Sequence, residues 1–141
     1  MTSPELELTH CIEFSSAHRL HDPALTDAEN AKLYGPCNNL NGHGHTYRLE
    51  VTVRGCVPRS GMIIDLNVLR VIMHEEVFDH VDHKHLDKDV AFLAGRISTA
   101  ENLALAFWER LAPPIEKRGG GQLVRVRVYE GSDSFVDCFG V

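Results

Sequence analysis

Strict alternation of apolar and polar residues marks two segments in the first half of the chain. One face of residues 45–54 consists of His45, Tyr47, Leu49, Val51 and Val53. One face of residues 12–20 consists of Ile12, Phe14, Ser16, His18 and Leu20. A period of two is typical of a half-buried β-strand. We therefore predict strands over about residues 9–20 and 43–54, joined by a long polar loop over residues 21–41.

A third segment, residues 123–130, alternates between valines and arginines. The valines that share one face are Val124, Val126 and Val128. Glu130 falls on this same face, where a carboxylate is costly to bury without a partner. Two interpretations stay open: Glu130 ends the strand and meets a donor or a ligand, or the strand ends at Tyr129 and Glu130 belongs to the following turn.

Two segments between these strands have helical spacing. Asp65 can cap the first helix, whose apolar residues recur every three or four positions: Leu66, Leu69, Ile72, Met73 and Val77. The second helix is expected to begin at Ser98-Thr-Ala-Glu101, which has the spacing of a capping box, and to end before Pro113-Pro114. Its apolar stripe comprises Leu103, Phe107 and Leu111. The predicted order is strand, strand, helix, helix, strand, strand, and each helix has one apolar face for a sheet.

Two histidines on the second predicted strand indicate a metal site. His43 and His45 are two residues apart, so their side chains point to the same side of an extended chain. Without a metal, two imidazoles on an inward face leave several polar nitrogens to satisfy. His18 is the natural third ligand, although a single buried histidine is more often a hydrogen-bonded core residue. Three neutral histidines with an open fourth position are typical of a catalytic zinc ion, which acts as a Lewis acid.

Composition limits the classes of protein to consider. A chain of 141 residues has the length of one domain, which we assign to residues 1–141. Its net charge of −6 argues against a nucleic-acid or anionic-membrane partner, and no apolar run is long enough to span a membrane. The amino end lacks the pattern of a signal peptide. The four cysteines are not spaced like those of a disulfide framework, which indicates reduced thiols and a cytoplasmic location.

A polar stretch, residues 78–87, combines three histidines with several aspartates. It suits a second metal cluster or a solvated helix end, and the pattern alone favours the solvated end. The adjacent Asp82 and His83 are also candidates for a proton relay, because a carboxylate can orient an imidazole that works near neutral pH. The relay would serve Cys37, whose thiol pKa a nearby cation would lower.

Five separated segments of the chain, in this order, resemble the 6-pyruvoyltetrahydropterin synthases: residues 12–20, 29–45, 82–87, 98–103 and 128–130. The resemblance implies an α+β tunnelling fold (T-fold) of ββααββ order, with two helices on one face of a four-stranded antiparallel sheet. It also implies a homohexamer of two stacked trimers, in which the sheets of each trimer close into a barrel and remove exposed sheet edges. Active sites of such an assembly lie at subunit interfaces.

The resemblance implies a zinc-dependent reaction in tetrahydrobiopterin biosynthesis. A carbon–oxygen lyase of this family converts 7,8-dihydroneopterin triphosphate to 6-pyruvoyltetrahydropterin and releases triphosphate, commonly with Mg²⁺ present. Histidines at the positions of His18, His43 and His45 hold Zn²⁺ in the family. The cysteine at the position of Cys37 is the general base.

Further roles follow from the same resemblance. The pair matching Asp82 and His83 completes the relay from the neighbouring subunit, which replaces the solvated interpretation for these two residues. The carboxylate matching Glu130 anchors the pterin, helped by the hydroxyl matching Thr99. Ala100 departs from the family pattern, which often has a second hydroxyl residue there, and this puts one pterin hydrogen bond in doubt. His74, His80 and His85 are then expected to be surface residues.

Three alternatives remain at this point. A 6-carboxytetrahydropterin synthase of queuosine biosynthesis would share the histidines, but its cysteine usually lies closer to them; here five residues separate Cys37 from His43. A relative that cleaves dihydroneopterin has a glutamate in place of the cysteine. A non-catalytic zinc-binding module would leave Cys37, the Asp-His pair and Glu130 without a shared purpose.

Four residues are candidates for a basic patch that binds the anionic substrate: Arg19, Lys32, Arg48 and Lys84.

Overall fold

The computed structural model describes residues 3–141 and is built on a five-stranded sheet of order β3-β1-β2-β4-β5. The strands are β1 (Glu5–His18), β2 (His43–Cys56), β3 (Lys84–His85), β4 (Gln122–Glu130) and β5 (Phe135–Cys138). The four longer strands form the expected antiparallel sheet. A short strand that was not expected, β3, adds a two-residue parallel pairing at the edge of β1.

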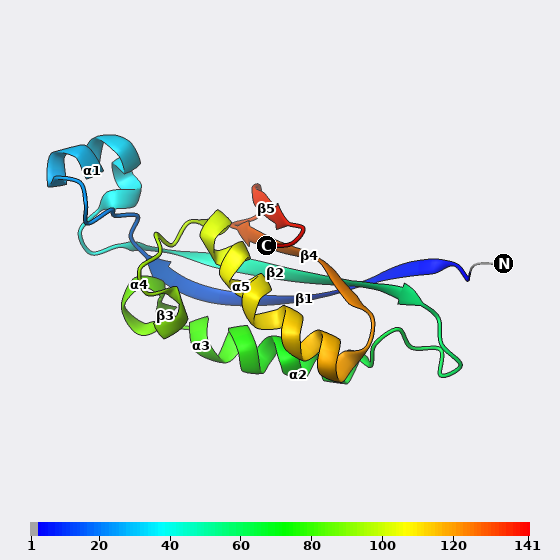
Figure 1. Cartoon of the computed structure of the whole chain (residues 1–141). Helices are drawn as coiled ribbons and strands as arrows, with labels where there is room; N and C mark the ends of the chain where they lie inside the picture. Colours follow the sequence, from blue (N-terminus) through cyan, green and yellow to red (C-terminus); the bar gives the residue numbers. More distant parts are fainter. Residues whose placement is uncertain (1–2) are drawn as a thin grey trace.

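Helices α2 (Leu66–Met73) and α5 (Ala100–Pro114) cover one face of this sheet. The other helices are α1 (Asp27–Tyr34), α3 (Asp79–Val81) and α4 (Leu86–Asp89). A π-helical turn, His74–Phe78, joins α2 to α3. Figure 1 shows α2 and α5 lying along the sheet, whereas α1 lies beyond the end where β1 stops and β2 begins. Within the described residues, no helix combines the length and the apolar character that a membrane span requires.

The core lies between the sheet and these two helices, as the apolar pattern predicts. From β2, Leu49, Val51 and Val53 are completely buried, and so are Leu69 and Val77 of the α2 segment. The apolar stripe of α5 is buried as well: Leu103, Phe107 and Leu111. Leu66, in the first turn of α2, is the exception and is half exposed. Burial of these side chains is the main force that holds the helices on the sheet.

The region predicted as a polar loop contains a helix. Thr26 caps α1 through a capping box: its hydroxyl accepts from the Glu29 amide, and the Glu29 carboxylate accepts from the Thr26 amide. This helix buries only Asn30, so it lacks the apolar stripe by which helices are usually recognised. A 3₁₀ turn, Gly35–Asn38, follows it and carries Cys37.

Both predicted ends of the second helix were wrong. Thr99, rather than Ser98, is the cap, since its hydroxyl accepts from the Asn102 amide. The helix also passes through Pro113 and Pro114 and ends in a π-helical turn that begins at Ile115. Ile115 is completely buried, and the apolar contact it gains offsets the hydrogen bonds that the two prolines cannot donate.

The valine face of the last long strand contains a register shift. A β-bulge opposite Thr52 and Val53 brings Leu123 level with Val53, so Leu123 is buried and Val124 is only partly so. The strand then continues to its predicted end. Glu130 belongs to β4 and pairs with Tyr47, which excludes the interpretation that it is a turn residue.

Candidate metal centre and its surroundings

The sheet register brings four candidate side chains to one end of three strands. His18 at the end of β1 lies directly opposite His43 at the start of β2. His45 lies two residues further along β2, on the same face. Glu130 at the end of β4 lies opposite Tyr47, which shares this face. Candidate ligand residues that are more than 100 positions apart in the sequence therefore meet at one end of these strands.

These side chains form a compact cluster. Among the described residues, one atom each of His18, His43, His45 and Glu130 lies within 4.8 Å of all the others. The two Nε2 atoms of His18 and His43 are 3.1 Å apart, and the Nε2 of His45 lies 3.1 Å from Glu130 Oε1. Two nitrogens bound at 2.0–2.1 Å to a tetrahedral zinc ion would be about 3.3 Å apart. The spacing of the cluster therefore suits a metal ion of that size.

The hydrogen bonds of His18 prepare it to be a ligand. Its ring is completely buried, and its Nδ1 lies 2.8 Å from the carbonyl oxygen of Ser98. Since a carbonyl can only accept, the proton must be on Nδ1, and the Nε2 lone pair faces His43. Metal-binding histidines are commonly oriented by such a bond from the other ring nitrogen. The hydroxyl of Tyr47 also contacts this ring, at 3.3 Å from Nδ1 and 3.4 Å from Nε2 of His18.

Two ring nitrogens of the cluster have no hydrogen-bond partner. His43 Nδ1 and His45 Nε2 are both buried and unpaired, and the contact of His45 with Glu130 lacks hydrogen-bond geometry. Buried polar atoms without partners are rare in folded proteins because each costs free energy. A cation bound among the Nε2 atoms of the histidines would give His45 Nε2 a partner, so the residues present fit the zinc ion that the sequence predicts.

The electrostatic surroundings keep two of these histidines neutral. Burial is the largest influence on His18 and on His43, and it lowers the pKa of both imidazoles. The neighbouring histidines lower these pKa values further, whereas the charge of Glu130 opposes the shift. Neutral imidazoles are the form that binds a metal. Burial also raises the pKa of the Tyr47 phenol far above its usual range, so this hydroxyl remains protonated.

Glu130 combines contact with the cluster and access to solvent. Its side chain is 28% exposed, and Oε1 lies 3.9 Å from His18 as well as 3.1 Å from His45. An accessible carboxylate at this position can bind the N–H groups of a ligand that approaches the metal, or complete the metal's own coordination.

Cys37 lies outside the four-residue cluster. Its 3₁₀ turn is attached to the end of β1, where the Leu20 amide donates to the Cys37 carbonyl at 2.9 Å. The residue is partly buried and its thiol is free. The turn thus brings Cys37 to the same end of the sheet as the histidines, and its role as the general base stays a prediction.

Asp82 and His83 form a hydrogen-bonded pair at the outer edge of β1. His83 Nδ1 lies 2.7 Å from Asp82 Oδ2, while Asp82 Oδ1 accepts from the Ser15 amide at 3.0 Å. Burial raises the pKa of Asp82, but these two hydrogen bonds outweigh it and lower the pKa overall. The His83 imidazole is 82% exposed, and its backbone has a φ of +59°, a strained value for a residue with a side chain.

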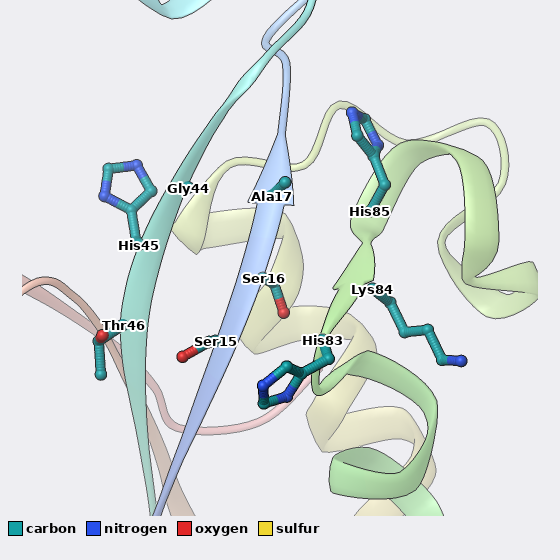
Figure 2. A pocket seen from close by; sticks show the side chains of 9 residues that line it. All are labelled: Ser15, Ser16, Ala17, Gly44, His45, Thr46, His83, Lys84 and His85. Carbon is teal, nitrogen blue, oxygen red and sulfur yellow. The ribbon is translucent and has the colours of Figure 1, made fainter.

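The pair lies beside a cavity of about 590 Å³. The residues that line this cavity include Ser15, His83 and Lys84, and also His45 of the histidine cluster. Figure 2 shows His83 on the β3 side of β1, with the His45 ring projecting on the far side of β2. Within one chain, β1 therefore lies between the side chain of His83 and the ring of His45.

Thr99 has a structural role in this chain, because its hydroxyl caps α5. Its predicted contact with a pterin is an additional role that stays a prediction. Ser98 and Tyr47 were not predicted as site residues. Tyr47 continues the face of His45 along β2, which is a usable signal, but nothing in the sequence indicates that the Ser98 carbonyl meets His18.

Comparison with known proteins identifies the relatives of this chain. A family described as "6-pyruvoyl tetrahydropterin synthase" matches residues 7–140. The "6-pyruvoyl tetrahydrobiopterin synthase" of Homo sapiens is 41% identical over 94% of this chain and 90% of its own length. The protein of the same name from Drosophila melanogaster is 39% identical over 97% of this chain and 81% of its own. The solved structure of Caenorhabditis elegans 6-pyruvoyl tetrahydropterin synthase has a TM-score of 0.89 at 38% identity and covers 100% of this chain and 99% of that chain.

Proposed function

The chain belongs to the 6-pyruvoyl tetrahydropterin synthase family, and from this we propose that it converts 7,8-dihydroneopterin triphosphate to 6-pyruvoyltetrahydropterin with release of triphosphate. The reaction is a carbon–oxygen bond cleavage within tetrahydrobiopterin synthesis. The observation that carries the proposal is the cluster of three histidines and one glutamate within 4.8 Å. The T-fold that presents this cluster is shared with the structural relative from C. elegans.

Zinc is the metal that we assign to the cluster, with His18, His43 and His45 as its ligands. The neutral, nitrogen-rich donor set and the spacing near 3 Å support this choice. When bound, zinc would supply a Lewis acid that polarises the side-chain oxygens of the substrate. Mg²⁺ would act on the triphosphate, since hard oxygen ligands suit it.

The chain's own residues bind the substrate and move its protons. Glu130, exposed at the edge of the cluster, would accept hydrogen bonds from the pterin N–H groups and so orient the ring. Cys37 would remove a carbon-bound proton as the thiolate. Asp82 would hold His83 in one tautomer through the 2.7 Å contact between Asp82 Oδ2 and His83 Nδ1. In that tautomer His83 would exchange protons with the Cys37 thiol.

A complete site requires a second subunit under this proposal. The exposed side chain of His83, which β1 separates from the ring of His45, supports donation to a neighbouring chain in a homohexamer. The protein is proposed to act in the cytoplasm, and its four free thiols support a reducing compartment.

The direct test is product analysis with the zinc-loaded, assembled protein. Dihydroneopterin triphosphate is supplied with Mg²⁺ under exclusion of oxygen, and the products are identified by mass spectrometry. A pyruvoyl-bearing tetrahydropterin and triphosphate are expected. A carboxylated pterin with acetaldehyde would instead assign the chain to the 6-carboxytetrahydropterin branch, and unchanged substrate would favour a non-catalytic zinc-binding module.

A further inference from the structure

A second cavity has a volume of about 580 Å³ and is formed by the chain after β1, by α4 and by the loop before α5. Figure 1 shows α4 beside the end of β1. Five side chains with N–H groups line the cavity: Arg19, His21, His85, Lys88 and Arg96.

The cavity is lined by sequence neighbours of the histidine cluster. Arg19 directly follows His18, and Ile97 directly precedes Ser98, whose carbonyl holds the His18 ring. The Nε2 of His85 lies close to Gly42, the residue before His43. The cavity is therefore at the same end of β1 and β2 as the cluster.

The two cations are available to bind an anion. Among residues 3–141, neither the Arg19 guanidinium nor the Lys88 ammonium has a carboxylate within 4.0 Å. Arg19 is held in place by neutral groups, since its Nε donates to the Asn38 carbonyl at 2.9 Å. A third cation of the wall, Arg96, is instead paired with Glu109 at 2.8 Å.

The two histidines of the cavity present their remaining nitrogens as donors. The Asn38 amide nitrogen lies 3.0 Å from His21 Nδ1 and donates to it, so a neutral His21 carries its proton on Nε2. In the same way, the Asp87 backbone amide donates to His85 Nδ1 at 3.3 Å, and the proton of His85 is on Nε2. Neutral imidazoles fixed in this tautomer donate to an anion without first being protonated.

The two carboxylates of the wall already accept from the backbone. Asp87 Oδ2 accepts from the Arg19 amide at 2.7 Å, and Asp22 Oδ1 accepts from the Ala24 amide at 2.9 Å. Because these oxygens already accept backbone hydrogen bonds, they compete less strongly for the neighbouring cations. In a chain of net charge −6, this is a local concentration of donors beside the metal cluster.

We propose that this cavity binds the triphosphate tail of the substrate, with Arg19 and Lys88 as the charged contacts and His21 and His85 as neutral donors. The inference rests on the proposed function and adds the position of the tail. The support for this position is the nearness of these donors to the His18 end of β1 and to Gly42, the residue before His43. Lys84 and Arg48, which the sequence also offered, line other cavities, and Lys32 does not line this one.

The test compares two lysines that lie four positions apart. Calorimetric titration of the zinc-loaded protein with inorganic triphosphate is carried out on Lys88→Gln and on the matched control Lys84→Gln, with the zinc content measured afterwards. We expect Lys88→Gln to weaken triphosphate binding about tenfold and Lys84→Gln to leave it unchanged. His21→Gln, which keeps a neutral side-chain donor, should weaken it less than His21→Ala. Equal binding by both lysine variants, or weakening only by Lys84→Gln, would overturn the proposal.

A second measurement separates this inference from the proposed function. With dihydroneopterin triphosphate, Lys88→Gln should raise KM about tenfold with little change in kcat, whereas binding of dihydroneopterin without phosphate should not change. If neither the parent protein nor any variant turns the substrate over, but Lys88→Gln still weakens the binding of inorganic triphosphate, then the anion site is supported and the proposed function is refuted. Equal weakening of both pterins by Lys88→Gln would show a general loss of the site and refute a tail-specific role.

Discussion

His18 Nδ1 lies 2.8 Å from the carbonyl oxygen of Ser98, a residue 80 positions further along the chain. This bond joins the end of β1 to the residue before the cap of α5. It sets the position of the proton on the ring, and it leaves Nε2 free to bind a metal. A residue of the helical layer thus determines the tautomer of a candidate metal ligand on the sheet.

His18→Gln is expected to abolish stable zinc binding. The change removes the one completely buried ligand, and the affinity should fall by more than the roughly 100-fold that the loss of a merely orienting group can cause. Zinc content after dialysis, measured by mass spectrometry, is the readout. The exposed His80 provides the control, and His80→Gln should retain the metal. A zinc-loaded His18→Gln protein would exclude His18 as a ligand.

Tyr47→Phe should keep the fold but weaken zinc binding by up to about tenfold, the lower end of the effect for a group that orients a ligand. The hydroxyl lies 3.3 Å from His18 Nδ1, while the ring stacks on Phe14 with centroids 5.0 Å apart and stays in place. Competition with a zinc chelator measures the affinity. Tyr129→Phe is the control, since that ring packs on Phe135 instead. An unchanged affinity would show that the Tyr47 hydroxyl has no part in the site.

Cys37→Ala should retain zinc and lose turnover by roughly 100- to 10,000-fold, the usual contribution of a general base. The 3₁₀ turn is held by the backbone bond from Leu20, which the substitution does not touch. Steady-state kinetics and zinc content are measured on the same preparation. Cys56→Ala, at an exposed thiol, should remain active. An active Cys37→Ala enzyme would remove this residue from the proposed mechanism.

Gly42→Ala should destabilise the entry into β2 by about 1–3 kcal/mol and lower zinc retention. Its φ is +77°, and a Cβ would lie 2.9 Å from the His18 carbonyl oxygen. Gly61→Ala is a matched control, because φ there is +82° but no atom lies within 4 Å of the added carbon. Urea unfolding measures both variants. Equal losses of stability would mean that the backbone conformation alone, and not the close approach to His18, requires glycine.

Acid should destabilise the protein in part through Asp137. Its hydrogen bonds with Arg127, at 2.6 Å and 2.9 Å, are the main reason that its pKa lies below the usual range. The ionised form therefore stabilises the fold above the ordinary aspartate pKa of about 4, and this contribution disappears as the pH falls through the lower folded value.

Asp137→Asn should consequently cost about 1 kcal/mol at pH 7 and progressively less below pH 4. Unfolding free energies from urea titrations across this pH range give the comparison. Asp133→Asn is the control, since that carboxylate accepts only from the adjacent Ser132 among the described residues. A constant difference between Asp137→Asn and the parent at all pH values would contradict the assignment.

The alternation of the strands and the spacing of His43 and His45 were readable because a strand has a period of two. That period assigns these histidines to the face of Tyr47, and the faces of β1 and β2 were predicted correctly. The missed helix α1 has a capping box but no apolar stripe, so local capping was the only signal available. Ends of elements were less predictable: the hydroxyl of Thr99 rather than that of Ser98 caps α5, and the helix continues through two prolines to the buried Ile115.

The sequence by itself determined to which face of a strand each candidate histidine belongs, and it predicted which residues would carry the chemistry. The tertiary structure alone decided that His18 meets His43, that Glu130 reaches His45, and that the Ser98 carbonyl fixes a proton on His18. It also decided that Arg19 and Lys88 share one cavity, whereas Lys84 lines another. The physical reason is that periodicity is a local property of the backbone, whereas distances between separate segments depend on strand register and on the packing of helices against the sheet.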